Sequence, residues 1–243
     1  MKGNLLNLII DAGNTQVKLV CFERDQIVDQ KRFEADDIDG VKVFLTNLQY
    51  HKSILSSVQS NEATKRLSAL IQPTIVLTKN TALPISFENY TTLETLGSDR
   101  ISNAVAANYL SNTNATLAID VGTCIKYDLV LGQSYQGGGI SPGLQMRFNA
   151  LHDYTGQLPK LKFEENSTLV GNSTKNAMLS GVIQGMIAEI NGIVDLYAQQ
   201  FQTLTIFLTG GDAKRFDKAL KNSIFAEENL TVKGLNIILE NNA

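Results

Sequence analysis

The chain has 243 residues, of which 43% are hydrophobic and 19% charged, with 18 glycines and 4 prolines. This composition is that of a globular protein with one or two domains, and it excludes a collagen, a disordered chain and a disulfide scaffold. The net charge of −3 without a basic cluster argues against a nucleic-acid partner, and two cysteines, Cys21 and Cys124, without a CxxC pair predict free thiols.

The first half of the chain predicts short strands that alternate with helices. Residues 5–10 and 17–22 have apolar strand patterns, and they are joined by the turn 11–15, where glycine and asparagine tolerate positive φ. Strands are also expected at 53–58 and 74–78, and helices at 36–48, 61–71 and 99–110, the last with Ser98 as its N-cap. The polar residues 111–114 suggest a boundary between a domain 1–112 and a domain 113–243.

The second half begins with a similar pattern. Strands are expected at 117–120 and 125–131 around the turn 121–124, and a Gly/Pro loop follows at 137–143. Apolar residues near helical spacing predict a long helix within 171–201. A strand at 205–208, a turn at 209–212, a helix at 213–220 and a closing strand at 231–239 complete the prediction.

No part of the sequence predicts a membrane or secretory segment. The opening run 5–10 is interrupted by Asn7 and is too short for a signal sequence. No uninterrupted stretch reaches the roughly 18 apolar residues of a membrane helix. We therefore expect a cytoplasmic protein with no membrane partner. The two histidines, His51 and His152, are too far apart to suggest a zinc site.

The two halves share a short pattern at their first turns. Asp11 and Asp120 each end an apolar strand, and each is followed two residues later by a glycine. This similarity predicts a duplicated unit, because internal repeats record a repeated structure. Two unrelated hairpins that share a glycine turn are the alternative that the sequence leaves open.

These two turns are suited to hold the phosphates of a nucleotide. An aspartate at the end of a buried strand costs free energy unless a cation, a positive side chain or backbone N–H groups use its charge. The glycine lets the backbone approach a ligand, and successive N–H groups form an anion-binding concavity. Asn14, Thr15 and Thr123 add hydrogen-bonding side chains, and Lys18 can reach a phosphate from the second strand. The chain has neither a Walker loop nor a GxGxxG fingerprint.

Five segments in order resemble the motifs of type III pantothenate kinases. Residues 11–15 (DAGNT) look like DxGNT, 96–100 (LGSDR) like LGxDR, 120–123 (DVGT) like DxGT, 137–143 (GGGISPG) like GGxIxPG, and 209–213 (TGGDA) like TGGxA. The resemblance implies an α/β fold of duplicated actin-like (ribonuclease H-like) domains, with mixed sheets flanked by helices. It also implies ATP-dependent phosphorylation of pantothenate to 4′-phosphopantothenate in coenzyme A biosynthesis, by a homodimer that K⁺ or NH₄⁺ activates.

The resemblance also assigns roles to individual residues. It places Asp11 at the Mg²⁺-bound ATP phosphates, together with the nucleotide-binding residues Ala12, Gly13, Asn14, Thr15, Gln16, Val17, Lys18 and Thr123. Asp99 is implied to be the general base, and the pantothenate site is implied to contain Tyr90, Gly97, Ser98, Asp99, Arg100 and Thr174. Asp120 is implied to bind the monovalent cation.

Three residues depart from the family pattern. Cys124 and Lys126 follow the DxGT motif, where many members carry alanine and a hydroxyl residue, and Leu93 replaces a common proline. Lys126 brings a positive charge near the implied cation site. The sequence leaves open whether this charge weakens dependence on K⁺ or whether the side chain points away.

Structural interpretations compete with the functional ones. Asp99 and Arg100 could serve as a helix cap and a surface ion pair, Tyr90 could pack on the core, and Thr174 could satisfy the start of a helix. Two other functions also remain open at this point. One is phosphorylation of another small molecule by a kinase of the same superfamily, and the other is a non-catalytic, regulatory role in nucleotide binding.

Overall fold

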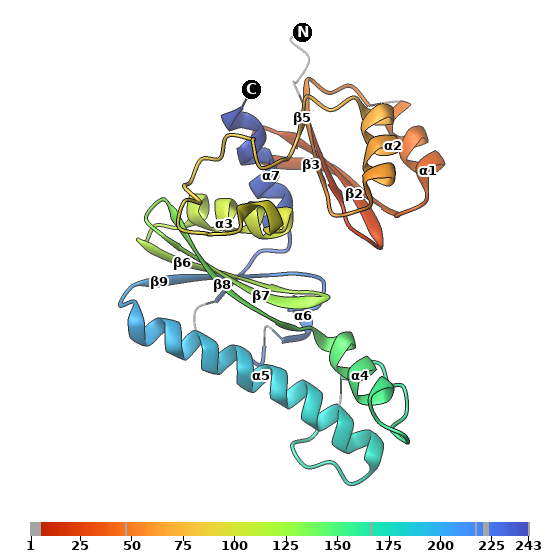
Figure 1. The fold of residues 1–243 in the computed structure, drawn as a ribbon, viewed down its shortest axis with the longest axis vertical. Helices are drawn as coiled ribbons and strands as arrows, with labels where there is room; N and C mark the ends of the chain where they lie inside the picture. Colours follow the sequence, from red (N-terminus) through yellow and green to blue (C-terminus); the bar gives the residue numbers. More distant parts are fainter. Residues whose placement is uncertain (1–5, 47, 166, 217, 221–223, 243) are drawn as a thin grey trace. The chain divides into compact units, whose positions relative to one another are not determined.

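The computed structural model describes residues 6–46, 48–165, 167–216, 218–220 and 224–242 (Figure 1). The chain divides into two compact units, of which the first comprises Met1–Tyr109 and Asn229–Ala243 and the second comprises Leu110–Glu228. The predicted boundary after residue 112 lies close to the observed one. The predicted second domain, however, extended to residue 243, whereas the last 15 residues pack with the first unit.

The first unit contains a mixed sheet with strand order β3-β2-β1-β4-β5. Its strands are β1 (Leu6–Ala12), β2 (Gln16–Glu23), β3 (Gln26–Glu34), β4 (Lys52–Ser57) and β5 (Ile75–Val76). β1 runs antiparallel to β2 and parallel to β4. Because β1 is covered on both faces, five of its seven residues are buried, as expected for a central strand.

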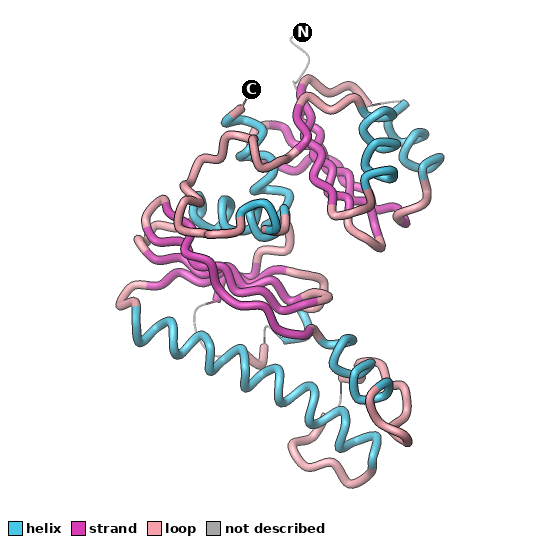
Figure 2. The backbone as a smooth tube through the Cα atoms, viewed as in Figure 1, coloured by secondary structure: helices cyan, strands magenta, loops and turns pink. Residues whose placement is uncertain are grey.

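Among the described residues, four α-helices and one 3₁₀ turn complete the first unit. They are α1 (Ile38–Thr46), α2 (Asn61–Ile71), η1 (Leu93–Thr95), α3 (Ser98–Leu110) and α7 (Leu230–Asn241). Apolar side chains of α1 and α2 join Leu8 and Ile10 of β1 in one core cluster. Asn7, on the alternate face of β1, instead donates to Asn236 of α7 at 2.9 Å. The sheet therefore has helices on both faces (Figure 2).

The second unit repeats the sheet of the first. Its strand order is β10-β9-β6-β7-β8, which read in reverse is the order of the first sheet. Its strands are β6 (Ala115–Val121), β7 (Cys124–Leu131), β8 (Ser134–Pro142), β9 (Leu204–Thr209) and β10 (Ile224–Ala226). β6 pairs antiparallel with β7 and parallel with β9, as β1 does with β2 and β4. The predicted duplication is therefore confirmed.

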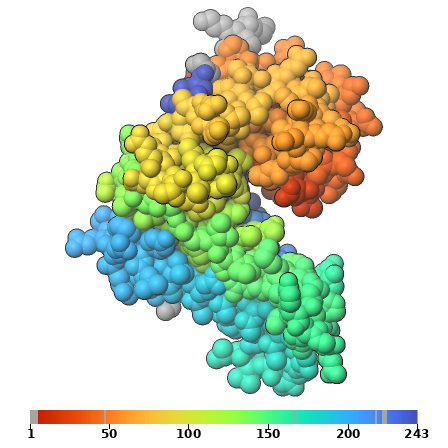
Figure 3. Space-filling view, viewed as in Figure 1, coloured from red at the N-terminus to blue at the C-terminus, as the bar shows by residue number. Residues whose placement is uncertain are grey.

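The helices of the second unit are α4 (Leu144–Asp153), α5 (Thr174–Gln200) and α6 (Ala213–Phe216). Within this unit α5 runs along one face of the sheet, while α4 and the first turns of α5 extend beyond it (Figure 1, Figure 3). The core combines apolar residues of β6, β7 and β9 with one face of α5, including Leu179, Val182, Met186 and Ile190.

One described helix, α5, is long and apolar enough in composition to cross a membrane. It still contains charged residues such as Glu189 and Asp195, so it is not a continuous apolar stretch of the kind that the sequence lacks. The helix packs on its own sheet, and Met186 and Ile190 are fully buried there. The packing accounts for its apolar composition, as it does for the core helix of any globular protein.

The predicted closing strand 231–239 is wrong, because this segment is the helix α7. Its β-branched residues suggested a strand, but Leu235, Ile238 and Leu239 recur at helical spacing and are all buried. Gly234 allows the close approach, since a Cβ there would lie 1.9 Å from the Ser102 carbonyl oxygen on α3. Tertiary packing thus outweighs local β-propensity in this segment.

Other differences are smaller. The predicted loop 137–143 continues the strand β8 as far as Pro142, and β3 was not predicted. The predicted helix 213–220 is observed only as α6. Three residues of predicted elements lie outside the described residues: residue 217 of this helix, residue 5 of the first predicted strand and residue 47 of the helix expected at 36–48. α3 begins at Ser98 itself, and Ile101 N donates to the Gly97 oxygen, so Ser98 is not the N-cap that we expected.

We expect Gly234→Ala to lower the free energy of unfolding by about 1–3 kcal/mol, because the added methyl group would collide with the backbone of α3. Gly185→Ala on α5 is the matched control, since its Cβ would meet open space. That control should be neutral or should stabilise by up to about 1 kcal/mol. Urea denaturation measures both changes, and equal stability of the two variants would contradict the packing described for α7.

Candidate active site

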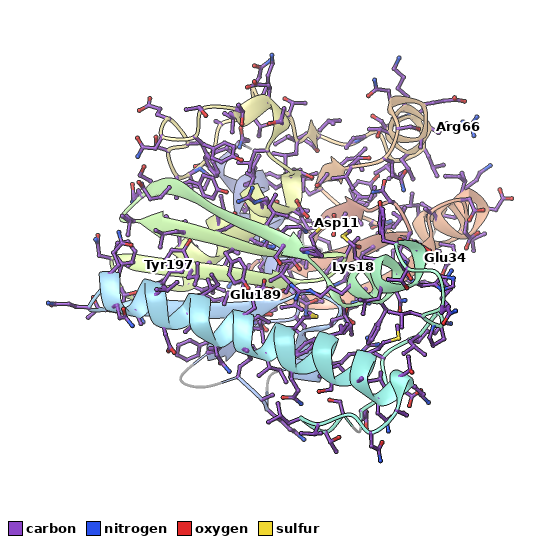
Figure 4. The ribbon with its side chains drawn as sticks, turned by 60° about the horizontal axis from the view of Figure 1, so that its bottom comes forward. Asp11, Lys18, Glu34, Arg66, Glu189 and Tyr197 are labelled. Carbon is purple, nitrogen blue, oxygen red and sulfur yellow. The ribbon has the colours of Figure 1, made fainter. Side chains whose placement is uncertain are left out.

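The turn between β1 and β2 carries the first predicted phosphate-binding motif. Asp11 lies near the end of β1, opposite Lys18 in the strand register, and Figure 4 shows the two side chains on neighbouring strands. Gly13 N donates to the Gln16 oxygen at 2.9 Å and closes the turn. Gln59 Nε2 donates to the Gly13 oxygen at 2.7 Å, and this contact fixes the turn from the loop after β4.

The surface of this turn is available to a ligand. Asn14, Thr15 and Gln16 are exposed, whereas Ala12 and Val17 on either side are buried. Lys18 Nζ donates to Asn229 Oδ1 at 2.7 Å, so this ammonium group is held at the start of α7. The predicted nucleotide-binding residues of the first turn therefore divide into an exposed tip and a buried base.

The same sheet edge carries the start of α3. β1 and β4 are parallel and Asp11 is opposite Ser56, so the carboxyl ends of both strands share one edge. Ser56 Oγ donates to Ser98 Oγ at 2.8 Å. The structure thus brings the aspartate of the first motif to the N-terminal end of α3, where the partial positive charge of a helix favours anions.

The residues at the start of α3 leave room for the Asp99 carboxylate. Asp99 Oδ1 accepts a hydrogen bond from Arg100 N at 2.9 Å. A Cβ on Gly97 would lie 2.5 Å from the same oxygen, so a side chain at residue 97 would collide with the carboxylate. A larger residue at position 97 would therefore displace the Asp99 side chain from its observed position.

Arg100 is a buried guanidinium rather than a member of a surface pair. Its exposure is 5%, its Nη1 lies 3.5 Å from Tyr90 Oη, and its Cζ lies 5.9 Å from the centre of the Tyr90 ring. Burial of a charged group is costly, which favours a functional interpretation for this residue. Tyr90 also lies on the wall of a cavity of about 560 Å³ within residues 79–93, a volume suited to a small ligand.

Three glycine-containing loops meet at the carboxyl end of β6 in the second unit. Gly143 N donates to the Thr123 oxygen at 3.0 Å, and Asp212 N donates to the Val121 oxygen at 2.9 Å. Gly210 has φ of +101°, and a Cβ there would lie 2.4 Å from the Val121 oxygen and 2.5 Å from Asp120 Oδ1. These contacts join the motifs at 120–123, 137–143 and 209–213 at one place.

The Asp120 carboxylate is engaged by a lysine. Lys126 Nζ donates to Asp120 Oδ2 at 2.8 Å, and the two residues face each other across β6 and β7. The side chain of Lys126 thus points toward Asp120 and not away from it. A monovalent cation does not fit well on this carboxylate, because a second positive charge about 4 Å from the ammonium would meet a repulsion of about 4 kcal/mol.

Thr174 lies in the second unit, at the first residue of α5. The helix is capped by Ser173, whose Oγ accepts from Asn176 N at 3.2 Å, so the Thr174 hydroxyl is not the side chain that caps it. Thr174 is exposed and lines an apolar groove of about 840 Å³ between α4 and α5. Tyr154, on the same groove, is 88% exposed.

Sequence reasoning missed a polar network that fixes the end of β8. Arg147 on α4 donates to Ser141 Oγ and to the Pro142 oxygen, each at 2.8 Å, and forms an ion pair with Glu189 on α5. Tyr127 Oη donates to Glu189 at 3.3 Å, and burial, followed by the charge of Glu189, raises the pKa of Tyr127. No local sequence signal reveals this network, because its members come from distant segments.

Two further titratable groups are shifted by burial. Burial raises the pKa of the Cys21 thiol to about 11, with a smaller contribution from Asp29, so this cysteine is a protonated core residue. Both cysteines are free, as predicted. Burial also raises the pKa of Asp212 in the glycine loop, and the nearby Arg215, 2.6 Å away, opposes the shift.

Comparison with known proteins decides the family. Residues 7–196 match the sequence model described as type III pantothenate kinase. The chain belongs to this family. The type III pantothenate kinase of Phocaeicola vulgatus is 39% identical over 240 residues, covering 98% of this chain and 99% of the relative. The type III pantothenate kinase of Christiangramia forsetii is 41% identical over 249 residues, covering 98% and 99%.

Solved structures confirm the actin-like α/β fold expected from the pantothenate kinase motifs. A Campylobacter jejuni protein described as a conserved Baf family transcriptional activator aligns with a TM-score of 0.65 at 18% identity, covering 97% of this chain and 98% of the other. The inorganic polyphosphate/ATP-glucomannokinase of Arthrobacter sp. strain KM aligns with a TM-score of 0.56 at 11% identity, covering 99% and 100%. At these identities the likeness concerns the fold alone.

We expect Gly210→Ala to destabilise this pantothenate kinase family member by about 1–3 kcal/mol, because alanine adds both an unfavourable φ and a collision with β6. Gly211→Ala is the matched control, since no heavy atom lies within 4 Å of its added Cβ. Chemical denaturation of both variants measures the difference. Equal losses would show that the glycine loop does not approach β6 in the way described.

Proposed function

We propose that this chain transfers the γ-phosphoryl group of ATP to the primary hydroxyl of pantothenate. The product is 4′-phosphopantothenate, and the reaction is the first step of coenzyme A biosynthesis. The observation that carries the proposal is the cluster at one sheet edge of the first unit, where Asp11 and the Asp99–Arg100 start of α3 are joined through the hydrogen bond between Ser56 and Ser98. Phosphoryl transfer requires this kind of positioning and charge stabilisation rather than covalent chemistry.

We propose that Asp99 is the general base. Its carboxylate lies at the start of α3, where it can accept the hydroxyl proton of the acceptor as the new bond to phosphorus forms. The buried Arg100 is suited to bind the pantothenate carboxylate through charge-assisted hydrogen bonds, each worth about 1.5–3 kcal/mol. Tyr90 and the backbone of Gly97 and Ser98 complete the proposed acceptor site in the first unit, and Thr174 of the second unit is proposed separately as a residue that binds pantothenate.

ATP with Mg²⁺ is the proposed phosphoryl donor. No group of three or more His, Cys, Asp or Glu side chains forms a metal cage within the described part of the chain. Mg²⁺ is commonly held by one or two carboxylates together with substrate phosphates. Asp11 supplies such a carboxylate beside the exposed tip of the first turn, and Thr123 is proposed to contact ATP from the second turn. The metal would neutralise the charge that develops on the phosphates.

A homodimer and a cytoplasmic location are also proposed. A dimer should show a mass near twice 26.6 kDa in light scattering. The apolar groove that contains Thr174 and Tyr154 is the surface that a second copy would cover, since large exposed apolar patches commonly mark interfaces. A monomer at micromolar concentration would contradict the proposed assembly without affecting the proposed reaction.

We expect Asp99→Asn to lower kcat about 10²–10⁴-fold while ATP still binds, because an amide cannot accept the proton. Asp39→Asn, an exposed first-turn aspartate on α1, is the matched control and should keep its activity. A coupled assay for ADP release gives kcat, and calorimetry gives the affinity for ATP. Near-normal kcat in Asp99→Asn would remove Asp99 from the role of base.

The acceptor separates this function from its alternatives. We expect ATP turnover with pantothenate and none with acetate or hexoses, measured by ADP release and by mass spectrometry of the product. Turnover with a sugar but not with pantothenate would favour another kinase of the superfamily. ATP binding without turnover on any acceptor would favour a non-catalytic nucleotide-binding role.

A further inference from the structure

The ion pair between Asp120 and Lys126 lies at the base of the second phosphate turn. Asp120 is the last residue but one of β6, and Lys126 lies directly opposite on β7, so the five residues between them include the turn that contains Thr123. The ammonium nitrogen is 2.8 Å from the carboxylate oxygen. This lysine is thus fixed by strand register as well as by charge.

The pair is largely removed from solvent. The side chains of Lys126 and Asp120 are 18% and 12% exposed, whereas those of the Lys175–Glu164 pair are 50% and 51% exposed. An exposed pair contributes little, about 0–1 kcal/mol, and forming a buried one costs much of its Coulomb energy in lost hydration. Stability alone is therefore a weak reason for a lysine at this position.

The ion pair lies beside the three glycine loops at 120–123, 137–143 and 209–213. Their backbone N–H groups are candidates for phosphate binding. Gly210 comes so close to Asp120 that its added Cβ would lie 2.5 Å from the second carboxylate oxygen, Oδ1. Gly122 lies within the same turn, with its added Cβ 3.6 Å from that oxygen. One carboxylate oxygen thus faces the ammonium, and the other faces the loops.

We infer that the Lys126 ammonium is the resident cation of this site and takes the place of the K⁺ or NH₄⁺ that the family resemblance implied. The inference rests on the proposed function, because it concerns how the same phosphate site is charged. A tethered ammonium is present at a high effective concentration whatever the salt, whereas a free monovalent ion must be recruited from solution. The reaction catalysed by this chain should therefore be independent of K⁺ and NH₄⁺.

The first measurement compares wild-type turnover in three media at one ionic strength. The three media contain KCl, NaCl or tetramethylammonium chloride, each at about 100 mM, so that the screening of charges is the same. ATP is added as its tetramethylammonium salt. We expect kcat/KM for ATP to agree within about twofold in all three, since K⁺ has no site to fill. Stimulation of the wild type by K⁺ of tenfold or so would overturn the inference.

The second measurement removes the tethered charge. We expect Lys126→Ser to lose about tenfold or more in kcat/KM in tetramethylammonium, and to regain most of it with K⁺ or NH₄⁺, since a small hydroxyl leaves room beside Asp120. Lys126→Arg should remain indifferent to K⁺, because it keeps the charge. Lys52→Ser is the matched control, since Lys52 also pairs with a carboxylate, Glu240 at 3.7 Å. Lys52 lies at the start of β4, at the opposite end of that strand from the first phosphate turn. It should behave like the wild type in all media.

A binding measurement separates this inference from the proposed reaction. The affinity for a non-hydrolysable ATP analogue, measured by calorimetry, should be independent of K⁺ in the wild type and dependent on it in Lys126→Ser. If no acceptor is phosphorylated in any medium, the proposed function fails, and this affinity still decides the role of Lys126. Wild-type affinity that rises with K⁺, or Lys126→Ser affinity that equals the wild type in every medium, would overturn it. If Lys126→Ser does not fold, the dependence of turnover and affinity on K⁺ is measured in the wild type and in Lys126→Arg instead.

Discussion

In both units a buried central strand ends near an aspartate that is followed by a glycine turn. Both units depend on compensating the charge of this aspartate. Asp11 and Asp120 stand at the carboxyl ends of β1 and β6, each surrounded by apolar strand residues. A carboxylate in this position loses hydration, so the surrounding chain must supply compensating groups. The glycines and the parallel neighbouring strand provide the backbone geometry around such a carboxylate. The lysine on the opposing strand provides a positive charge near it.

The two units satisfy this requirement in different ways. In the first, the strand edge adjoins the start of α3, and the opposing Lys18 reaches Asn229 at the start of α7. In the second, the opposing Lys126 reaches the aspartate itself. The same duplicated sheet thus carries an anion-attracting helix end in one unit and an internal ion pair in the other.

Belonging to the type III pantothenate kinase family does not by itself fix every property of this chain. The motif residues are in place, but Lys126 is a local departure whose consequence depends on a single distance. A lysine can extend into solvent or fold back on a carboxylate, and its flexible stem permits both. The structure distinguishes these two positions of the side chain, and the proposed independence from K⁺ rests on the one observed.

The sequence alone located the motif residues, because turns of the Asp-x-Gly kind and apolar strand patterns are local properties that short segments record. The resemblance of those motifs to a known family predicted the fold class, and the repeated turn indicated a duplication while two unrelated hairpins stayed open. Only the tertiary structure decided that residues 230–241 form a helix, since docking against β1 and α3 outweighs their β-branched composition. The same holds for the network of Arg147, Glu189 and Tyr127, and for the direction of Lys126. These contacts join segments that are distant in the chain or settle one rotamer among several, and no local pattern encodes either.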